Sequence, residues 1–95
     1  MRISEVVWTE SDVGHIARHG VTPTEVEEVL AAGPLWRRGR RHPETRQESL
    51  LALSQTEAGR YLVVVLSPRA LGRARCVTAM EMSSKVRRYY ERHRR

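Results

Sequence analysis

The sequence has few cysteines and no long apolar run, the features that mark disulfide-bonded, cysteine-ligated or membrane-spanning proteins. One cysteine among 95 residues excludes an internal disulfide and a cysteine-based zinc cluster. The longest apolar run, residues 62–66, is far shorter than the roughly 20 residues that cross a bilayer, which excludes a membrane-spanning helix. The first residues lack the apolar stretch of a secretory signal. We therefore expect a cytoplasmic protein without a cofactor.

Acidic residues are scarce in the second part of the chain. Residues 37–95 carry fifteen basic groups against five acidic ones, whereas residues 1–36 carry two basic groups against six acidic ones. This asymmetry is typical of a domain with one cationic face. Such a face binds polyanions in a salt-dependent manner, and nucleic acid and an acidic protein segment satisfy it equally well.

Length and composition predict one domain over residues 1–95. The hydrophobic content of 40% suits a single small core, and no change of composition marks a boundary. A domain of this size buries only about two-thirds of its unfolded surface. Binding of a partner protein would therefore add usefully to its stability.

The first third of the chain predicts a strand and two helices. Residues 3–8 are rich in β-branched and aromatic side chains, which favours a strand. A capping-box spacing that begins at Thr9 predicts a helix ending at Gly20. The same spacing from Thr22 to Glu25 predicts a second helix, which a Gly-Pro pair ends.

The remainder predicts strands followed by a last helix. Residues 35–38 favour the start of a strand, and residues 39–43 favour an exposed basic loop. Three more strands are expected at residues 46–54, 60–67 and 74–79. The last helix runs from about residue 82 to residue 93, with Ser83 as the favoured N-cap and Thr78 as an alternative. The order β-α-α-β-β-β-β-α predicts an α+β fold whose helices pack on one face of a mostly antiparallel sheet.

Short segments along nearly the whole chain occur in an order and spacing that resembles a known family. They are Val7–Trp8, His15–Val21, Glu25–Leu30, Leu53–Thr56, Gly59–Val65, Val77–Ala79 and Arg87–Tyr89. In these segments the chain is similar to the BrnT family of small toxins, which share the RelE-like ribonuclease fold. The resemblance implies a single toxin domain that cleaves RNA and is held inactive by a cognate antitoxin encoded beside it.

Two positions depart from the family pattern. Met80 stands where such proteins typically have an arginine, and Val86 stands where they have an acidic residue in the first turn of the last helix. If the arginine contacts phosphate, its replacement leaves a binding fold with weak cleavage or none.

Metal-independent RNA cleavage needs a base for the 2′-hydroxyl proton, an acid for the leaving 5′-oxygen and cations for the phosphate. Arg46 and Arg60, which open two predicted strands, and Arg88 of the last helix are the candidate cations. We expect them to converge on one side of a curved sheet. His19 is the candidate for proton transfer, although a position beside Gly20 also suits a plain helix end.

A further group of basic and aromatic residues is predicted to bind RNA. The candidates are Trp36, Arg37, Arg38, Arg40, Arg41 and Tyr90. Aromatic side chains flanked by arginines stack on the bases of single-stranded RNA. Packing in the core is the alternative for the two aromatic residues, and a solvated loop is the alternative for the arginines. His15 and His19 share a helix face, but no third ligand follows at a convincing spacing, so we expect no metal site.

Three functions remain open from the sequence. The first is an endoribonuclease toxin that binds RNA and forms a hetero-oligomer with its antitoxin. The second is a toxin-fold interaction module that has lost cleavage through changes such as Met80. The third is a plain nucleic-acid-binding protein, which the basic charge alone permits.

Overall fold

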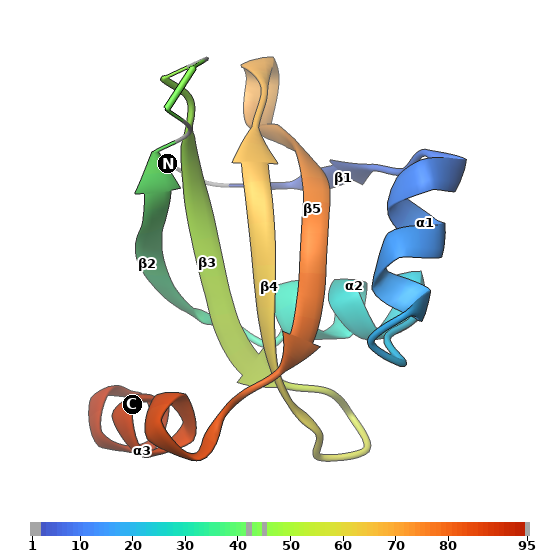
Figure 1. The fold of residues 1–95 in the computed structure, drawn as a ribbon. Coiled ribbons are helices and arrows are strands. Elements are labelled where there is room, and N and C mark those ends of the chain that lie inside the picture. The colour runs from blue at the N-terminus through green and yellow to red at the C-terminus, as the bar shows by residue number, and fades with distance from the viewer. Residues whose placement is uncertain (1–2, 42, 45, 95) are drawn as a thin grey trace.

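The computed structural model describes residues 3–41, 43–44 and 46–94, which form five strands and three α-helices (Figure 1). The elements are β1 (Glu5–Val7), α1 (Glu10–Ala17), α2 (Pro23–Ala31), β2 (Leu35–Arg41), β3 (Glu48–Gln55), β4 (Tyr61–Pro68), β5 (Arg73–Glu81) and α3 (Ser84–His93), with a 3-10 turn at Ala70–Gly72. The α+β class and the element order are therefore confirmed. None of the helices in these ranges has the length and apolarity needed to cross a bilayer.

All five strands belong to one sheet in the order β1-β5-β4-β3-β2. β1 runs parallel to β5, and the other neighbours pair antiparallel, so the predicted mostly antiparallel sheet is confirmed. β2 and β1 form the two edges. The basic strand β2 is therefore paired on one side only, and its other side is free of sheet neighbours.

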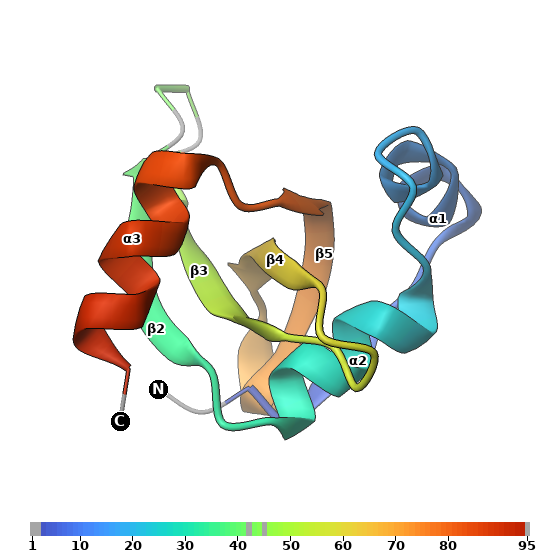
Figure 2. The same cartoon turned by 90° about the horizontal axis from the view of Figure 1, so that it is seen from below.

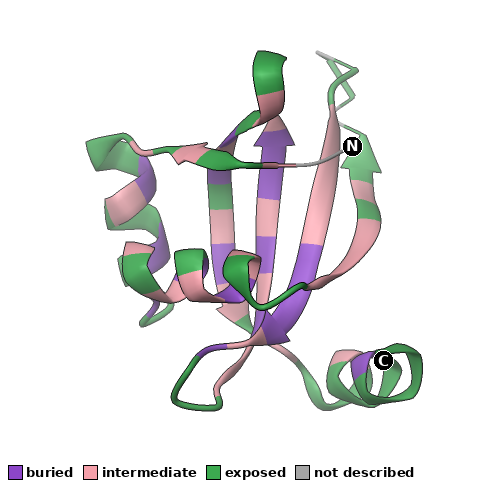
Figure 3. Cartoon of the chain, turned by 180° about the vertical axis from the view of Figure 1, so that it is seen from behind, coloured by how far each residue is buried: buried purple, intermediate pink, exposed green. Residues whose placement is uncertain are grey.

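The core lies on one face of the sheet, which we call the core face. Leu62, Val64 and Leu66 of β4 alternate onto this face and are fully buried. α1 and α2 cover it with Ile16 and Val26, which are also fully buried. Figure 3 shows the buried residues on the central strands and on the inner sides of these helices. The opposite side of the sheet, which carries Val63 and Val65, we call the open face.

The expectation that all helices pack on one face is wrong. α3 lies on the side of the sheet opposite to α2, as the view from below shows (Figure 2). Its Tyr90 meets Tyr61, which precedes the core residue Leu62 and so points to the open face. The reason is that α3 follows β5 after only two residues, Met82 and Ser83, and its aromatic residues pack against the open face at the nearest end of the sheet.

β2 is longer than the sequence predicts. The predicted basic loop over residues 39–43 is strand as far as Arg41, with a shift of register against β3 between Arg38 and Arg41. Gly39 makes this path possible, because a Cβ there would collide with Ser49 Oγ on β3. The arginines of this segment are therefore held on a strand, whereas His42 lies outside the described residues.

The predicted helix caps are confirmed. The Thr9 hydroxyl accepts from the backbone amide of Asp12, and the Thr22 and Glu25 side chains form a complete capping box. The Ser83 hydroxyl accepts from the amide of Val86 at 3.2 Å, so Ser83 caps α3. Each cap satisfies an amide that has no partner within its helix.

Cys76 is buried in β5, where its side chain is part of the core. Burial raises the pKa of its thiol to about 12. The thiolate is the reactive form of cysteine, so Cys76 is an inert packing residue near neutral pH.

Candidate functional site

Arg60, predicted to bind phosphate, is held by carboxylates of the protein. Its Nη1 donates to Glu25 Oε2 at 2.8 Å and to the carbonyl oxygen of Gly20 at 2.9 Å. Its Nη2 lies 3.3 Å from Glu81 Oε2. The hydrogen bond to Glu25 raises the pKa of Arg60 above its usual value. Arg60 thus joins the turn between α1 and α2 to β4 and β5, and its charge is already neutralised.

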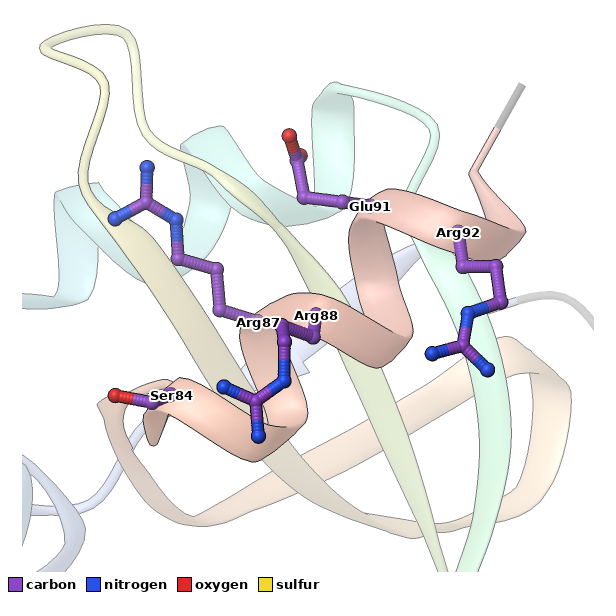
Figure 4. A pocket seen from close by; sticks show the side chains of 5 residues that line it. All are labelled: Ser84, Arg87, Arg88, Glu91 and Arg92. Carbon is purple, nitrogen blue, oxygen red and sulfur yellow. The ribbon is translucent and has the colours of Figure 1, made fainter.

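The three predicted phosphate cations do not converge. Arg46 lies exposed in the turn before β3, whereas Arg60 precedes β4 beside the far end of β3. The eight residues of β3 place the two about 25 Å apart, at roughly 3.3 Å per residue. Arg88 extends outward from α3 (Figure 4). The expectation that these arginines share one phosphate site is therefore wrong.

His19 lies exposed just beyond the end of α1. Its ring meets the ring of His15 edge to face, with centroids 5.7 Å apart. Two perpendicular views place α1 and α3 at opposite sides of the molecule (Figures 1 and 2). His19 is a neighbour of the Gly20 carbonyl that binds Arg60, but it is remote from the cations of α3.

A pocket of about 500 Å³ lies between the α2–β2 turn, the end of β3 and α3. We call it the α3 pocket. Two of the predicted RNA-binding residues, Trp36 and Tyr90, line it. Trp36 is partly buried and packs against the hydrophobic core, which is the alternative that the sequence left open for it. The residues that line it are Ala32, Gly33, Pro34, Leu35, Trp36, Ser54, Gln55, Tyr90, His93 and Arg94. The fold therefore brings aromatic, basic and amide side chains from three separate segments into one hollow.

Arginines and aromatic rings alternate where α3 meets the sheet. The Arg94 guanidinium lies 5.6 Å from the centroid of the Tyr90 ring, and its Nη1 donates to Gln55 Oε1 at 3.2 Å. The Arg87 guanidinium lies 3.8 Å above the Tyr61 ring. Tyr90 is only 6% exposed, so it mainly anchors α3 to the sheet and forms a wall of the α3 pocket.

His93 is held in a defined orientation on the rim of the same pocket. Its ring stacks on Tyr89 with centroids 4.1 Å apart, and Nδ1 lies 2.8 Å from the Tyr89 carbonyl oxygen. A carbonyl oxygen only accepts, so Nδ1 carries the proton and Nε2 of the neutral ring keeps its lone pair. The Tyr89 hydroxyl in turn accepts from Arg37 Nε, which ties α3 to β2.

The outer surface of α3 carries cations that the protein does not neutralise. Among the described residues, no carboxylate lies within 4.0 Å of Lys85, Arg87, Arg88 or Arg92. Figure 4 shows Arg88 and Arg92 extending to one side of the helix, while Arg87 and Glu91 extend to another. These cations lie on the same helix as His93, and they are available to a polyanion.

The arginines of β2 are partly neutralised. Arg41 and Arg38 lie 2.6 Å and 3.9 Å from the carboxylate of Glu48. The hydrogen bond from Arg41 lowers the pKa of Glu48. Exposed ion pairs of this kind are weak, at roughly 0–1 kcal/mol, so a phosphate group can replace the carboxylate. Arg37 adds a hydrogen bond to the Trp36 carbonyl oxygen at 2.8 Å, which fixes it beside the α3 pocket.

Sequence reasoning missed four polar residues of the α3 pocket, namely Ser54, Gln55, His93 and Arg94. The spacing of Tyr89 and His93, four residues apart on a helix, was the available signal for their ring contact. Arg94 follows α3 in a basic tail that resembles any solvated chain end. Its bond to Gln55 joins residues 39 positions apart, which no local pattern reveals.

Within the described ranges, no group of three or more His, Cys, Asp or Glu side chains is placed to hold a metal ion. A scan against models of protein families found no match to the chain, and no curated protein matches it.

Proposed function

We propose that this protein is an endoribonuclease toxin of the BrnT and RelE-like kind, which cuts single-stranded RNA through attack of the 2′-hydroxyl. The observation that carries the proposal is the α3 pocket, where the oriented imidazole of His93 lies with Trp36 and Arg94 beside a helix of unneutralised cations. Aromatic side chains and arginines are the groups that bind unpaired bases and phosphates.

Two residues of the α3 pocket, His93 and Arg94, together with Arg37 and Tyr89, which are hydrogen-bonded to each other beside it, suggest how the reaction runs. His93 Nε2 takes the proton of the 2′-hydroxyl, and the 2′-oxygen attacks the adjacent phosphorus. Arg94 and Arg37 stabilise the negative charge that builds on the phosphate oxygens. The 5′-oxygen leaves and takes a proton from the Tyr89 hydroxyl, the phenol stacked on His93. The products are a 2′,3′-cyclic phosphate and a 5′-hydroxyl end.

The resemblance to the BrnT family supports placing the active site at the same region of the molecule. RelE-like toxins commonly carry part of their active site on the last helix, and α3 supplies Tyr90, His93 and Arg94 to the pocket. The element order and the mostly antiparallel sheet agree with the fold that the resemblance implies. The proposal therefore assigns the proton transfer to His93 and not to His19.

Two histidine variants test the assignment directly. We expect His93→Ala to lower the rate of RNA cleavage by at least about a hundredfold, because the reaction loses its base. The matched variant His19→Ala removes an exposed histidine far from α3 and should cleave at the rate of the unmodified protein. Equal rates for all three proteins would contradict the role of His93.

A toxin of this kind needs a protein inhibitor, and we propose an acidic antitoxin that covers α3 in a hetero-oligomer. The support is that Lys85, Arg88 and Arg92 have no carboxylate partner among the described residues. RNA and the antitoxin then compete for the same cations. A partner that binds tightly but leaves RNA affinity unchanged at fixed salt would contradict this.

One observation favours a second function, an interaction module without cleavage. Met80 pairs with Val63 on the open face, where it is half-buried and supplies no cation. If the family's arginine at this position contacts the phosphate, the protein binds RNA without cutting it. A Met80→Arg variant that gains cleavage absent from the unmodified protein would support this function, and cleavage by the unmodified protein would exclude it.

A further inference from the structure

A second pocket, of about 460 Å³, lies on the open face at the end of the sheet where β3 begins. We call it the serine pocket, because Ser49 of β3 and Ser67 of β4 line it. The pairing of Leu50 with Leu66 puts these serines side by side. Side chains alternate along a strand, so Ser67 projects away from the core face to which Leu66 belongs.

Small side chains create this hollow. Next to Ser49, β2 contributes Gly39, where even a Cβ would collide with the serine hydroxyl. One step along the strands, the open face carries the larger side chains of Leu51 and Val65, which pair with each other. The row that contains the serines is therefore lower than the row beside it, and Val65 forms one wall of the pocket.

The hydroxyl of Ser67 faces the serine pocket without a protein partner. Ser67 is 9% exposed, yet its side chain makes no hydrogen bond to any residue in the described part of the chain. Among the described residues, the fully buried side-chain oxygen without a partner is Thr78 Oγ1 and not the Ser67 oxygen. The Ser67 hydroxyl is therefore open to the pocket, where it can donate to or accept from a polar ligand.

Cations, one carboxylate and apolar surface complete the pocket. Arg40, Arg41, Arg75 and Glu48 line it together with Val77, a residue that is 38% exposed. Arg41 is paired with Glu48, and Arg75 is paired with Asp12. No carboxylate of the described residues lies within 4.0 Å of Arg40, so its charge is available. Hydroxyl groups and a guanidinium suit a phosphate, and the valine side chains suit the face of a base.

We infer that the serine pocket holds a second nucleotide of the RNA strand that enters the α3 pocket. The phosphate binds Arg40 and the Ser67 hydroxyl, and the base covers Val77. Trp36 of the α3 pocket and Arg40 of the serine pocket are four residues apart on β2, about 13 Å at roughly 3.3 Å per residue. The RNA thus runs along β2, and the substrate is an RNA several nucleotides long. This inference rests on the proposed function.

RNA length distinguishes the two pockets. We expect Ser67→Leu, which fills the serine pocket, to weaken the binding of an RNA of about eight nucleotides roughly tenfold, while the affinity for a dinucleotide stays unchanged. Val63→Leu adds bulk to the same strand and face outside the pocket and serves as the matched control. Arg40→Gln should act like Ser67→Leu without altering the packing, and Arg18→Gln, at an exposed position that lines neither pocket, should have no effect.

A titration with adenosine 5′-monophosphate, followed by amide shifts, locates the sites independently of cleavage. We expect shifts at Ser49, Ser67 and Val77 as well as around His93. Shifts around His93 alone, with full affinity of Ser67→Leu and Arg40→Gln for the longer RNA, would overturn the second pocket and leave the proposed function standing. An absence of binding by mononucleotide and RNA at both pockets would overturn both.

Discussion

At the scale of single residues, Arg60 is the basic group with the most protein partners in the described part of the chain. It binds Glu25, Glu81 and the Gly20 carbonyl oxygen. Arg60→Gln leaves the half-buried Glu25 carboxylate without its cation, and we expect it to lower the free energy of unfolding by about 1–3 kcal/mol. Urea denaturation measures this, with Arg69→Gln at an exposed turn as the control, expected within about 0.5 kcal/mol of the unmodified protein. A loss of RNA cleavage by Arg60→Gln at full stability would instead point to a direct role.

A second residue with a predictable effect is Asp12, which accepts from Arg75 Nε at 2.8 Å and from Nη2 at 3.0 Å. These hydrogen bonds lower the pKa of Asp12 and outweigh the effect of burial. Because the pKa is lower in the folded than in the unfolded protein, the stabilisation is present above about pH 4 and is lost as the pH falls further. We expect the free energy of unfolding to fall between about pH 5 and pH 2, and to fall less steeply in Asp12→Asn. Parallel pH profiles for both proteins would contradict this.

Arg60 and Arg88 are alike in the sequence, since each directly precedes a tyrosine. Only the fold separates them, because the Glu25 partner of Arg60 lies 35 residues away. For the same reason the sequence did not predict His93 as a site residue, because its neighbours in the α3 pocket come from β2 and β3. Residue type predicted RNA-binding roles for Trp36 and Tyr90, which line the same pocket, but it could not predict which cations remain unpaired.

At the scale of elements, α3 depends on its cap. Ser83→Ala removes the hydroxyl that accepts from the Val86 amide, and we expect a loss of about 1 kcal/mol. Amide exchange in the first turn of α3 should become faster, while exchange in the central strands changes only with the global stability. Ser84→Ala, one residue later and outside the cap, is the matched control. Equal exchange in both variants would show that the cap does not hold the helix.

Element types were predictable where the signal is local. Capping residues at Thr9, Thr22 and Ser83 predicted all three helix starts. The side of the sheet that α3 covers was not predictable, because its contact with Tyr61 depends on the direction in which β5 ends. The path of β2 beyond Arg38 was also hidden, since a strand made of arginines and a glycine has no apolar alternation.

At the scale of the whole molecule, the charge asymmetry of the sequence serves the fold as well as binding. Acidic groups of the first 36 residues neutralise arginines of the later strands. The pairs are Glu5 with Arg73, Asp12 with Arg75, and Glu25 with Arg60. Nine cations of the described residues have no carboxylate within 4.0 Å, and four of them, Lys85, Arg87, Arg88 and Arg92, lie on α3. The sequence predicted one cationic face, but its position follows from these long-range pairs.

This distribution predicts the salt dependence of RNA binding. Each phosphate contact adds about 0.7 to the slope of log affinity against log salt for a single strand. Replacing Arg88 and Arg92 by glutamine should therefore reduce the slope by about 1.4. Replacing Arg18 and Arg69, which lie away from α3, should leave it unchanged. Equal slopes for the two double variants would show that RNA does not bind along α3.

The most direct measurement is incubation of the purified protein with single-stranded RNA in the presence of a metal chelator, followed by identification of the new ends. The proposed mechanism uses only protein side chains, namely His93 and Arg94 of the α3 pocket with Arg37 and Tyr89 beside it, so cleavage should continue and leave 2′,3′-cyclic phosphate and 5′-hydroxyl ends. RNA that stays intact, or cleavage that stops with chelator and leaves 5′-phosphate ends, would contradict it.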